Sequence, residues 1–360
     1  MRKIVLFMLI AFAVLLISGC VQQPAAGPVV TEPTEVETQA EEPLPEETEP
    51  AADEQITEED QPEPVTIRVA ALRGPTALGL LHLMRQKEQG YTQNEYDFQL
   101  VGAPVEIPPL LVQGEADVAA VPGNLAAVLY NQMDGAVQAL AVVTLGVLHV
   151  VDNSGEIQSI GDLAGRTIFI TGQGATPEFA LNYVLKQNGL TPGIDVFIEF
   201  RAETSEIAAL MQQGYAEIAL LPEPFVSTVL AQVDDLRIVL DLTEEWNKVQ
   251  QEYGLIMSVL IARREFIENN PEAMAIFMEE YAESIEFMTT KVPEGAQLAV
   301  DFGLIPALSI AESALPRTHI VFITGEEMQR NLTGFYGVLY NENPASIGGV
   351  LPDNDFFFIP

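Results

Sequence analysis

A glycine-rich turn at residues 172–177, with the sequence GQGATP, is the stretch best suited to holding a ligand. It follows a strand-like run and precedes a segment with a helical pattern. Glycine lets the backbone approach a ligand closely, Thr176 is a favourable N-cap, and Pro177 suits the first helical turn. The open amides and positive end of the helix would then face the ligand. A dinucleotide fingerprint needs a glycine where Pro177 stands, so we interpret the turn as a cradle of another kind.

Three other turns, at 73–76, 122–124 and 222–225, follow strand-like runs in the same way. Arg73 could bind an anion or lie on the surface. Glu223 could accept hydrogen bonds from a ligand, or simply be favoured at a helix N-terminus by the helix dipole. Ligands of open α/β sheets bind at the carboxyl ends of strands, so these turns are the expected walls of a cleft.

The sequence shows no arrangement typical of a catalytic centre. Its three histidines, His82, His149 and His319, are far apart and lack the spacing of metal ligands. No nucleophile elbow, phosphate-binding loop or Ser/His/Asp arrangement is present. We therefore expect no metal, no cofactor and no catalytic residue. His149 could line a hinge or be structural, and Trp246 could wall an aromatic ligand or pack in the core.

The elements that must position these turns form an internal repeat. Residue n resembles residue n + 100 over most of 67–140, most clearly between LLVQGEADVAAVPGN and LMQQGYAEIALLPEP, which begin at 110 and 210. Each copy alternates strands and helices, which predicts a parallel sheet with helices on both faces. The expected strands are 67–72, 97–101, 116–121, 167–171, 196–200 and 216–221. The expected helices are 77–89, 106–113, 124–132, 177–188, 205–213 and 225–232. Two such units predict two α/β lobes.

Two long apolar runs, 139–152 and 253–266, are predicted to be crossover strands that form a hinge. The remainder, 267–360, reads as mostly helical and is expected to pack back on the first lobe. Lobe one would then comprise 66–148 with 260–360, and lobe two 149–259.

The N-terminal part reads as an export signal and a tether. Residues 1–19 have a basic start and a short apolar run, typical of a signal peptide. LISGC, which ends at Cys20, resembles the lipobox at which bacterial lipoproteins are cleaved and lipidated. Residues 20–65 are rich in Pro, Thr, Gln and Glu and predict a disordered acidic tether. We expect an extracytoplasmic protein held on the membrane by its lipid.

The overall charge excludes one class of partner. The chain has 16 basic and 52 acidic residues, for a net charge of −36, and no basic stripe is visible. Nucleic-acid binding needs clustered Lys and Arg, so we exclude it.

Several motifs together resemble the solute-binding lipoproteins of bacterial ABC importers. They are ALRGPTALGLLHLM at 71–84, the LVQGEADVAAVP block at 111–122, TGQGATPE at 171–178, LLPEPFVS at 220–227 and GGVLPDNDFFF at 348–358. The likeness is greatest to the group that binds nitrate, sulfonates, taurine and thiamine precursors. It implies a type II periplasmic-binding fold with two lobes, two crossover strands and a ligand in the cleft. By position, the pocket loops fall on Arg73, Gly74, Pro75, Thr76, Gly123, Asn124, Gln173, Gly174, Ala175, Thr176, Glu223 and Phe225.

The resemblance implies a monomer that captures a small molecule and delivers it to a membrane permease driven by ATPase subunits. Beyond Arg73, the sequence lacks an evident set of cationic pocket residues, which leaves room for a neutral or heteroaromatic organic ligand. Two alternatives stay open: a lyase on the same fold, and a sensory module that presents its ligand to a receptor.

Overall fold

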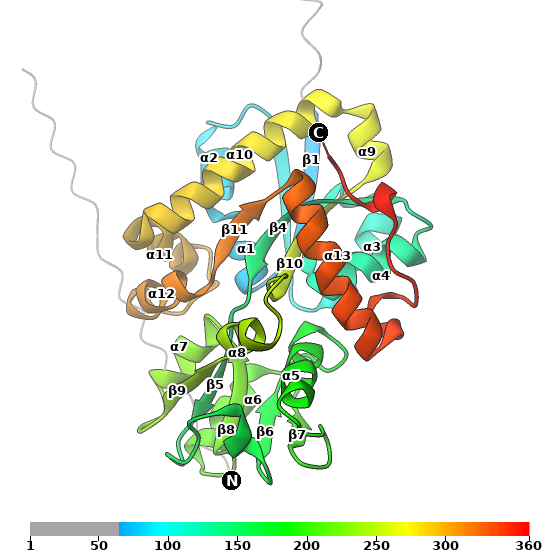
Figure 1. The fold of residues 1–360 in the computed structure, drawn as a ribbon. Helices are drawn as coiled ribbons and strands as arrows, with labels where there is room; N and C mark the ends of the chain where they lie inside the picture. Colours follow the sequence, from blue (N-terminus) through cyan, green and yellow to red (C-terminus); the bar gives the residue numbers. More distant parts are fainter. Residues whose placement is uncertain (1–64, 360) are drawn as a thin grey trace, which may run out of the picture. The chain divides into compact units, whose positions relative to one another are not determined.

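The computed structural model describes residues 65–359, which carry two β-sheets (Figure 1). The expected signal peptide, Cys20 and nearly all of the tether lie outside the described residues. The α/β fold class is confirmed, and each sheet has the helices of one repeat around it. We call the part built on the first sheet lobe one and the part built on the second sheet lobe two.

The first sheet has six strands in the order β11-β4-β10-β3-β1-β2. Their bounds are β1 Thr66–Leu72, β2 Glu95–Val101, β3 Val118–Pro122, β4 Val137–Leu145, β10 Ile256–Arg263 and β11 Ile320–Ile323. Strands β1, β2 and β3 are parallel, whereas β10 runs antiparallel between β3 and β4. The carboxyl ends of the three parallel strands therefore meet at one edge, which faces lobe two.

The second sheet repeats this plan with five strands in the order β7-β6-β8-β5-β9. Their bounds are β5 Leu148–Asp152, β6 Thr167–Ile170, β7 Phe197–Phe200, β8 Ile218–Pro222 and β9 Arg237–Asp241. Strands β6, β7 and β8 are parallel, and β5 lies antiparallel beside β8 as β10 lies beside β3. The 100-residue offset of the sequence thus appears as the same strand order in both lobes.

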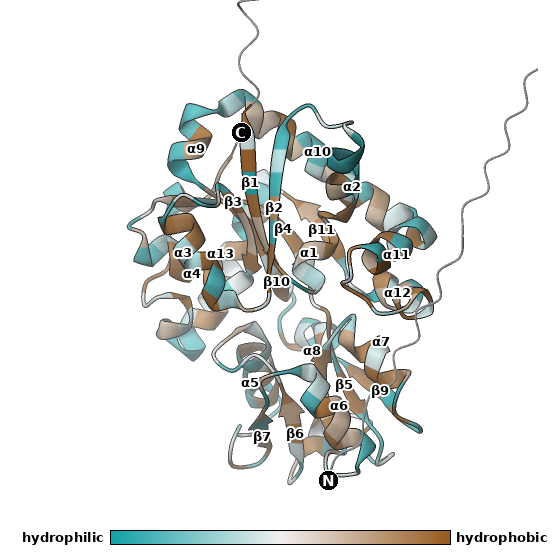
Figure 2. Cartoon of the chain, turned by 180° about the vertical axis from the view of Figure 1, so that it is seen from behind, coloured by the Kyte–Doolittle hydropathy of each residue, from teal (hydrophilic) through white to brown (hydrophobic). Residues whose placement is uncertain are grey.

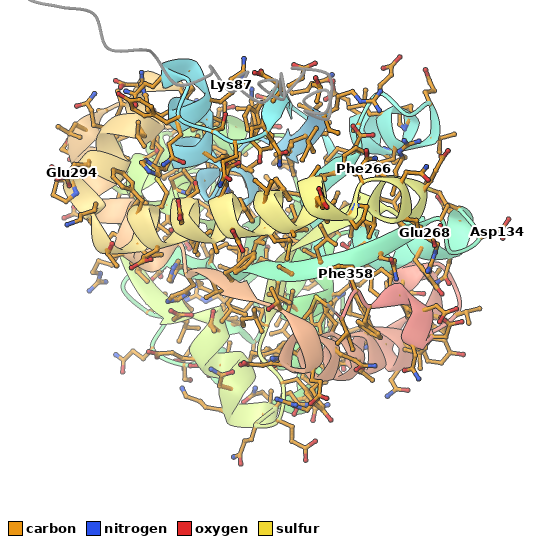
Figure 3. All side chains as sticks on the ribbon, turned by 90° about the horizontal axis from the view of Figure 1, so that it is seen from above. Lys87, Asp134, Phe266, Glu268, Glu294 and Phe358 are labelled. Carbon is orange, nitrogen blue, oxygen red and sulfur yellow. The ribbon has the colours of Figure 1, made fainter. Side chains whose placement is uncertain are left out.

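Helices α1 to α4 belong to the first copy and α5 to α7 to the second. Their bounds are α1 Pro75–Leu78, α2 Leu81–Gln89, α3 Ile107–Val112, α4 Gly123–Gln132, α5 Thr176–Gln187, α6 Thr204–Gln212 and α7 Phe225–Leu230. The remaining helices are α8 Leu242–Val249, α9 Arg264–Asn269, α10 Pro271–Thr290, α11 Val292–Asp301, α12 Leu308–Ala314 and α13 Gly325–Glu342. Viewed from above, α10 runs across the top of lobe one (Figure 3). No helix in residues 65–359 combines the length and apolar character needed to cross a bilayer.

One expected helix, 77–89, is wrong in detail because the structure breaks it into α1 and α2. The cause is Ser284 of α10, whose hydroxyl donates to the carbonyl of Gly79 at 2.6 Å. The same hydroxyl accepts from the Leu83 amide at 3.0 Å. A side chain from a distant helix thus occupies backbone groups at the break, a contact that helical periodicity cannot reveal.

The two apolar runs each contribute strands at the junction of the lobes. The first forms β4 and β5, joined by Gly146 and Val147, and the second contains β10. A Cβ at Gly146 would overlap Thr243, so only glycine fits where the linkers pass each other. The second link from sheet to sheet is longer, running through α8 and a loop into β10.

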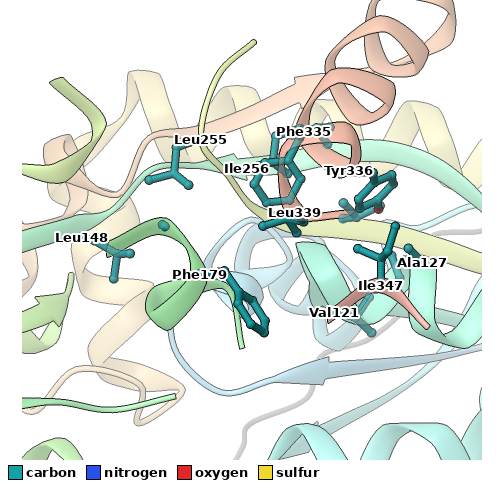
Figure 4. Packing of buried hydrophobic residues seen from close by; sticks show 14 of the residues in the cluster. Val121, Ala127, Leu148, Phe179, Leu255, Ile256, Phe335, Tyr336, Leu339 and Ile347 are labelled. Carbon is teal, nitrogen blue, oxygen red and sulfur yellow. The ribbon is translucent and has the colours of Figure 1, made fainter. Parts of the chain in front are cut away.

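The apolar core is continuous through this junction. Strand interiors are strongly hydrophobic, whereas the helices turn polar faces outward (Figure 2). A single cluster joins Leu148 and Phe179 of lobe two to Ile256 and Phe335 of lobe one (Figure 4). Trp246 of α8 is fully buried in this cluster, with its ring centroid 6.1 Å from that of Phe335. Trp246 is therefore a core residue and walls no ligand site.

Candidate ligand-binding cleft

A cavity of about 540 Å³ lies between the carboxyl ends of the parallel strands of the two repeats. Lobe one contributes Pro104, Val105, Pro122, Asn124 and Leu125. Lobe two contributes residues 172–175 and 200–202. A volume of this size suits a small organic molecule. The turn that first suggested a ligand cradle is therefore at the cavity, opposite the end of β3.

Four of the twelve residues expected in the pocket line this cavity, namely Asn124, Gln173, Gly174 and Ala175. Gln173 and Gly174 are exposed, and Gly174 has a φ of 73°, a conformation that favours glycine. Ala175 has an extended backbone and begins α5 as its N-cap. The expectation that Thr176 is the N-cap is wrong, because Thr176 is already the first helical residue.

Thr176 connects the lobes instead of facing the cavity. Its side chain is fully buried, and its hydroxyl donates to Oδ1 of Asn124 at 3.1 Å. The Nδ2 of Asn124 in turn donates to the carbonyl of Ser346 at 3.2 Å. Asn124 is a residue of α4, whose N-cap is Pro122, so its amide is not a cap. The Asn124 side chain is thus held by both lobes at the edge of the cavity.

The turn 73–76 does not line the cavity. Arg73 is exposed, and Thr76 is buried with its hydroxyl 3.1 Å from that of Ser258. Gly74 has a φ of 114°, and a Cβ there would lie 4.0 Å from Cε2 of Phe225 in lobe two. Gly74 and Phe225 therefore meet at a neighbouring part of the interface between the lobes, where Phe225 lines a smaller cavity of about 260 Å³. Pro75, the first residue of α1, lines neither of these two cavities.

Gly123 is needed for close packing. A Cβ at this position would lie 2.9 Å from the carbonyl oxygen of Ile256 and 3.2 Å from the ring of Phe335. Its own carbonyl accepts from the Tyr336 hydroxyl at 3.0 Å. The residue lets α4 approach β10 and α13, and so fixes the position of Asn124 next to it.

Glu223 is fully buried, and the protein itself binds its carboxylate. Arg317, from the segment Leu315–Arg317 of lobe one, donates Nε–H to Oε1 at 2.7 Å. The hydroxyl and amide of Ser227 each donate to the same carboxylate at 3.1 Å. Arg317 also donates to the Ser227 hydroxyl at 2.6 Å. Sequence reasoning missed Arg317, which lies in the tail outside both repeats.

Arg201 is the second residue that sequence reasoning missed, and it does line the cavity. It follows β7 directly, at the position that Val101 occupies in the first repeat. Its guanidinium lies over the ring of Phe169, 5.0 Å from the centroid. A basic residue immediately after an expected strand, in one repeat only, was the signal that could have identified it.

His149 takes a structural position near the junction of the lobes. Both ring nitrogens of buried His149 lack hydrogen-bond partners among residues 65–359, and Nδ1 lies 3.7 Å from Oδ2 of Asp241. Burial lowers the pKa of His149, against the opposing charges of Asp241 and Glu223. In this described part of the chain, no three His, Cys, Asp or Glu side chains are placed to bind a metal ion.

Comparison with known proteins gives one family match. Residues 92–248, from β2 to α8, match the family described as the periplasmic substrate-binding protein of phosphonate ABC transporters. None of the curated proteins is significantly similar to the chain in sequence.

Solved structures of transporter proteins share the fold. An ABC transporter from Parabacteroides distasonis aligns with a TM-score of 0.70 at 22% identity, over 81% of this chain and 98% of that one. The periplasmic aliphatic sulphonate binding protein SsuA from Escherichia coli aligns with a TM-score of 0.66 at 17% identity, over 82% and 93%. The alkanesulfonate-binding protein SsuA from Xanthomonas axonopodis pv. citri, bound to MOPS, gives 0.61 at 13% identity, over 81% and 96%.

The family match covers the segment that builds lobe two and reaches into lobe one, and the structural likeness extends over both sheets. The matched family and the duplicated strand order agree with the resemblance that the sequence motifs carry, and the two-lobed fold is confirmed. Residues 92–248 of the chain are thus similar to the periplasmic substrate-binding proteins of ABC transporters, and the described residues share the fold of solved proteins of this kind.

Proposed function

We propose that the 540 Å³ cavity captures one small organic molecule, around which the two lobes close before delivery to a permease. The observation that carries this proposal is the position of the cavity, between equivalent strand ends of the two repeats. Asn124, Gln173, Gly174, Ala175 and Arg201 are the proposed ligand contacts, because each lines it. The protein would do no chemistry on the molecule.

The boundaries of the moving parts are proposed near residues 148 and 260, with the whole of β10 staying in the sheet of lobe one. Polar side-chain contacts cross between these parts from Thr176 to Asn124, from Arg317 to Glu223 and Ser227, and from Lys186 to Glu342. These contacts would break when the lobes open. We also propose that lipidated Cys20 and the acidic tether hold the protein at the membrane surface, within reach of a permease.

Mass spectrometry can test whether the cavity holds a solute. The protein is equilibrated with a cell metabolite extract, separated from free metabolites and analysed for retained compounds. Ala175→Trp should abolish retention, because the new side chain would fill the cavity that Ala175 lines. Ala164→Trp is the matched control, since Ala164 is exposed in the turn before β6, at the end of the strand opposite to the cavity. A compound retained equally by all three proteins would contradict the proposal.

The lyase alternative predicts that a retained compound is converted, and the sensory alternative predicts delivery to a receptor and not to a permease. Incubating the retained compound with the protein and quantifying it over time addresses the first. Uptake of the same compound by vesicles that contain the permease addresses the second. Intact recovery and stimulated uptake are the expected results.

A further inference from the structure

We propose that the cleft discriminates against anions and takes an uncharged polar molecule. This inference rests on the proposed function of the cavity. Three groups around the cavity could bind an anion: the guanidinium of Arg201, the amide at the start of α5, and two amides beside Pro104. In each case, a carboxylate of the chain already occupies them.

Arg201 is the one charged residue among those that line the cavity. Its Nη1 donates to Oε2 of Glu199 at 3.1 Å and to the carbonyl of Phe200 at 2.7 Å. Its Nε lies 3.3 Å from Oε1 of Glu206. Two carboxylates thus oppose one positive charge, so the site offers little net attraction to an anion.

The N-terminus of α5 is occupied in the same way. The amide of Gly174 donates to Oε2 of Glu178 at 2.7 Å, where Glu178 lies in the first turn of the same helix. A ligand anion would have to compete with a carboxylate that is covalently part of the chain. Glu178 therefore places a carboxylate at the Gly174 amide, beside the helix end where the dipole would otherwise favour a ligand anion.

Lobe one repeats the arrangement across the cavity. Oε1 of Glu106 accepts from the amide of Gly102 at 3.1 Å and from that of Ala103 at 2.7 Å. These amides directly precede Pro104 and Val105, which line the cavity. Both sides of the cleft thus present amides already paired with a carboxylate, and the surroundings have a net negative charge.

The groups that a ligand can still contact are polar, and the positive charge of Arg201 among them is opposed by two carboxylates. The described lining contains no carboxylate, so a cation would find no direct partner there. Nη2 of Arg201 has no hydrogen-bond partner among residues 65–359 and can donate to a carbonyl or ring nitrogen. Pro104, Leu125 and Phe200 supply apolar surface for the body of the molecule. An uncharged organic molecule with a hydrogen-bond acceptor fits these groups.

The test removes the opposing carboxylates and measures anion binding. Calorimetric titrations with ethanesulfonate and methylphosphonate are compared for the wild type and for Glu199→Gln with Glu206→Gln. We expect weak binding by the wild type and a gain of about tenfold or more in the double variant, because Arg201 would keep its charge without its counter-charges. Circular dichroism checks that the variant is folded.

A control with the same change of net charge separates local from general effects. Glu272→Gln with Glu279→Gln alters two exposed acids on α10, the helix that runs across the top of lobe one (Figure 3). This control should bind the anions as weakly as the wild type. Equal gains in both double variants, no gain at Glu199 and Glu206, or tight anion binding by the wild type would each overturn the inference.

The failure of this inference is distinguishable from failure of the proposed function. If the compound retained by the wild type and lost in Ala175→Trp is an anion, the cavity is a solute site and the charge argument is wrong. If no compound is lost in that variant, the proposed function fails, while the anion titrations still decide the charge argument.

Discussion

The guanidinium of Arg317 in lobe one lies 2.7 Å from the carboxylate of Glu223 in lobe two, and that carboxylate is fully buried. The sequence had presented Glu223 as a candidate ligand contact beside a strand end. In the structure its charge is satisfied by the protein, so the pair connects the two lobes where they meet. This contact therefore holds a residue of lobe one against a buried charge of lobe two.

Removing Arg317 should destabilise the protein strongly. Arg317→Gln leaves the buried Glu223 carboxylate without its counter-charge, and such losses cost about 3 kcal/mol or more. Urea denaturation measures the change. Arg85→Gln is the matched control, because Arg85 pairs with Asp301 on the surface at 2.8 Å and should cost less than about 1 kcal/mol. Similar costs for the two substitutions would show that the buried pair is not important.

Replacing either of two glycines of α13 with alanine should change the stability of the fold in opposite directions. A Cβ at Gly334 would overlap the ring of Tyr253, in the loop before β10, whereas Gly337 has nothing within 4 Å. Gly334→Ala should therefore destabilise the fold by about 1–3 kcal/mol through overpacking. Gly337→Ala should stabilise it by up to about 1 kcal/mol through helix propensity. Thermal denaturation of both variants checks the sign, and equal signs would contradict the packing described here.

The hydroxyls of Thr176 and Thr76 should differ in their effect on lobe closure. Thr176→Val removes the 3.1 Å bond to Asn124 that crosses between the lobes. Thr76→Val removes the 3.1 Å contact with Ser258 inside lobe one. Both should lose about 1–3 kcal/mol of stability, because a buried polar partner is left unpaired. Small-angle X-ray scattering should find a larger radius of gyration only for Thr176→Val; a larger radius for Thr76→Val would argue against this assignment.

Stability should decrease on acidification, in part because of His149. Burial lowers the pKa of His149 below its usual 6.5, so the unfolded state binds the proton more readily than the folded state. The unfolding free energy should therefore fall as the pH drops below about 6.5, by up to about 1.4 kcal/mol per unit of pKa difference. His149→Leu should reduce this slope in urea titrations between about pH 7 and 5.5. His82, whose pKa burial also lowers, keeps the slope from vanishing; an unchanged slope in the variant would exclude a contribution from His149.

Much of the fold could be predicted because the sequence repeats the same pattern of strands and helices. The matching runs 118–122 and 218–222 share a strand pattern, similar turn residues and a proline at the same offset. Each copy of the repeat therefore predicts the same elements independently. The break between α1 and α2 was not predictable, since it depends on Ser284, some two hundred residues further along the chain.

The site was predictable in part for the same reason. Gly174 and Ala175 are placed by the strand that precedes them, and both line the cavity. Whether a polar side chain at a strand end meets the cavity or the other lobe depends on its neighbours in space. Thr176 and Glu223 form hydrogen bonds with residues of lobe one. The sequence could not identify Arg317 as the partner of Glu223, because the two residues are brought together only by the packing of the C-terminal tail against lobe two.

Trp246 is the sole tryptophan of the chain, and it is buried where the cores of the two lobes merge. Its ultraviolet emission therefore originates from this junction alone, with no second indole to obscure it. A solute that alters how α8 meets α13 will change the emission spectrum without any attached dye. The fluorescence of Trp246 can therefore report on the junction of the two lobes without labelling.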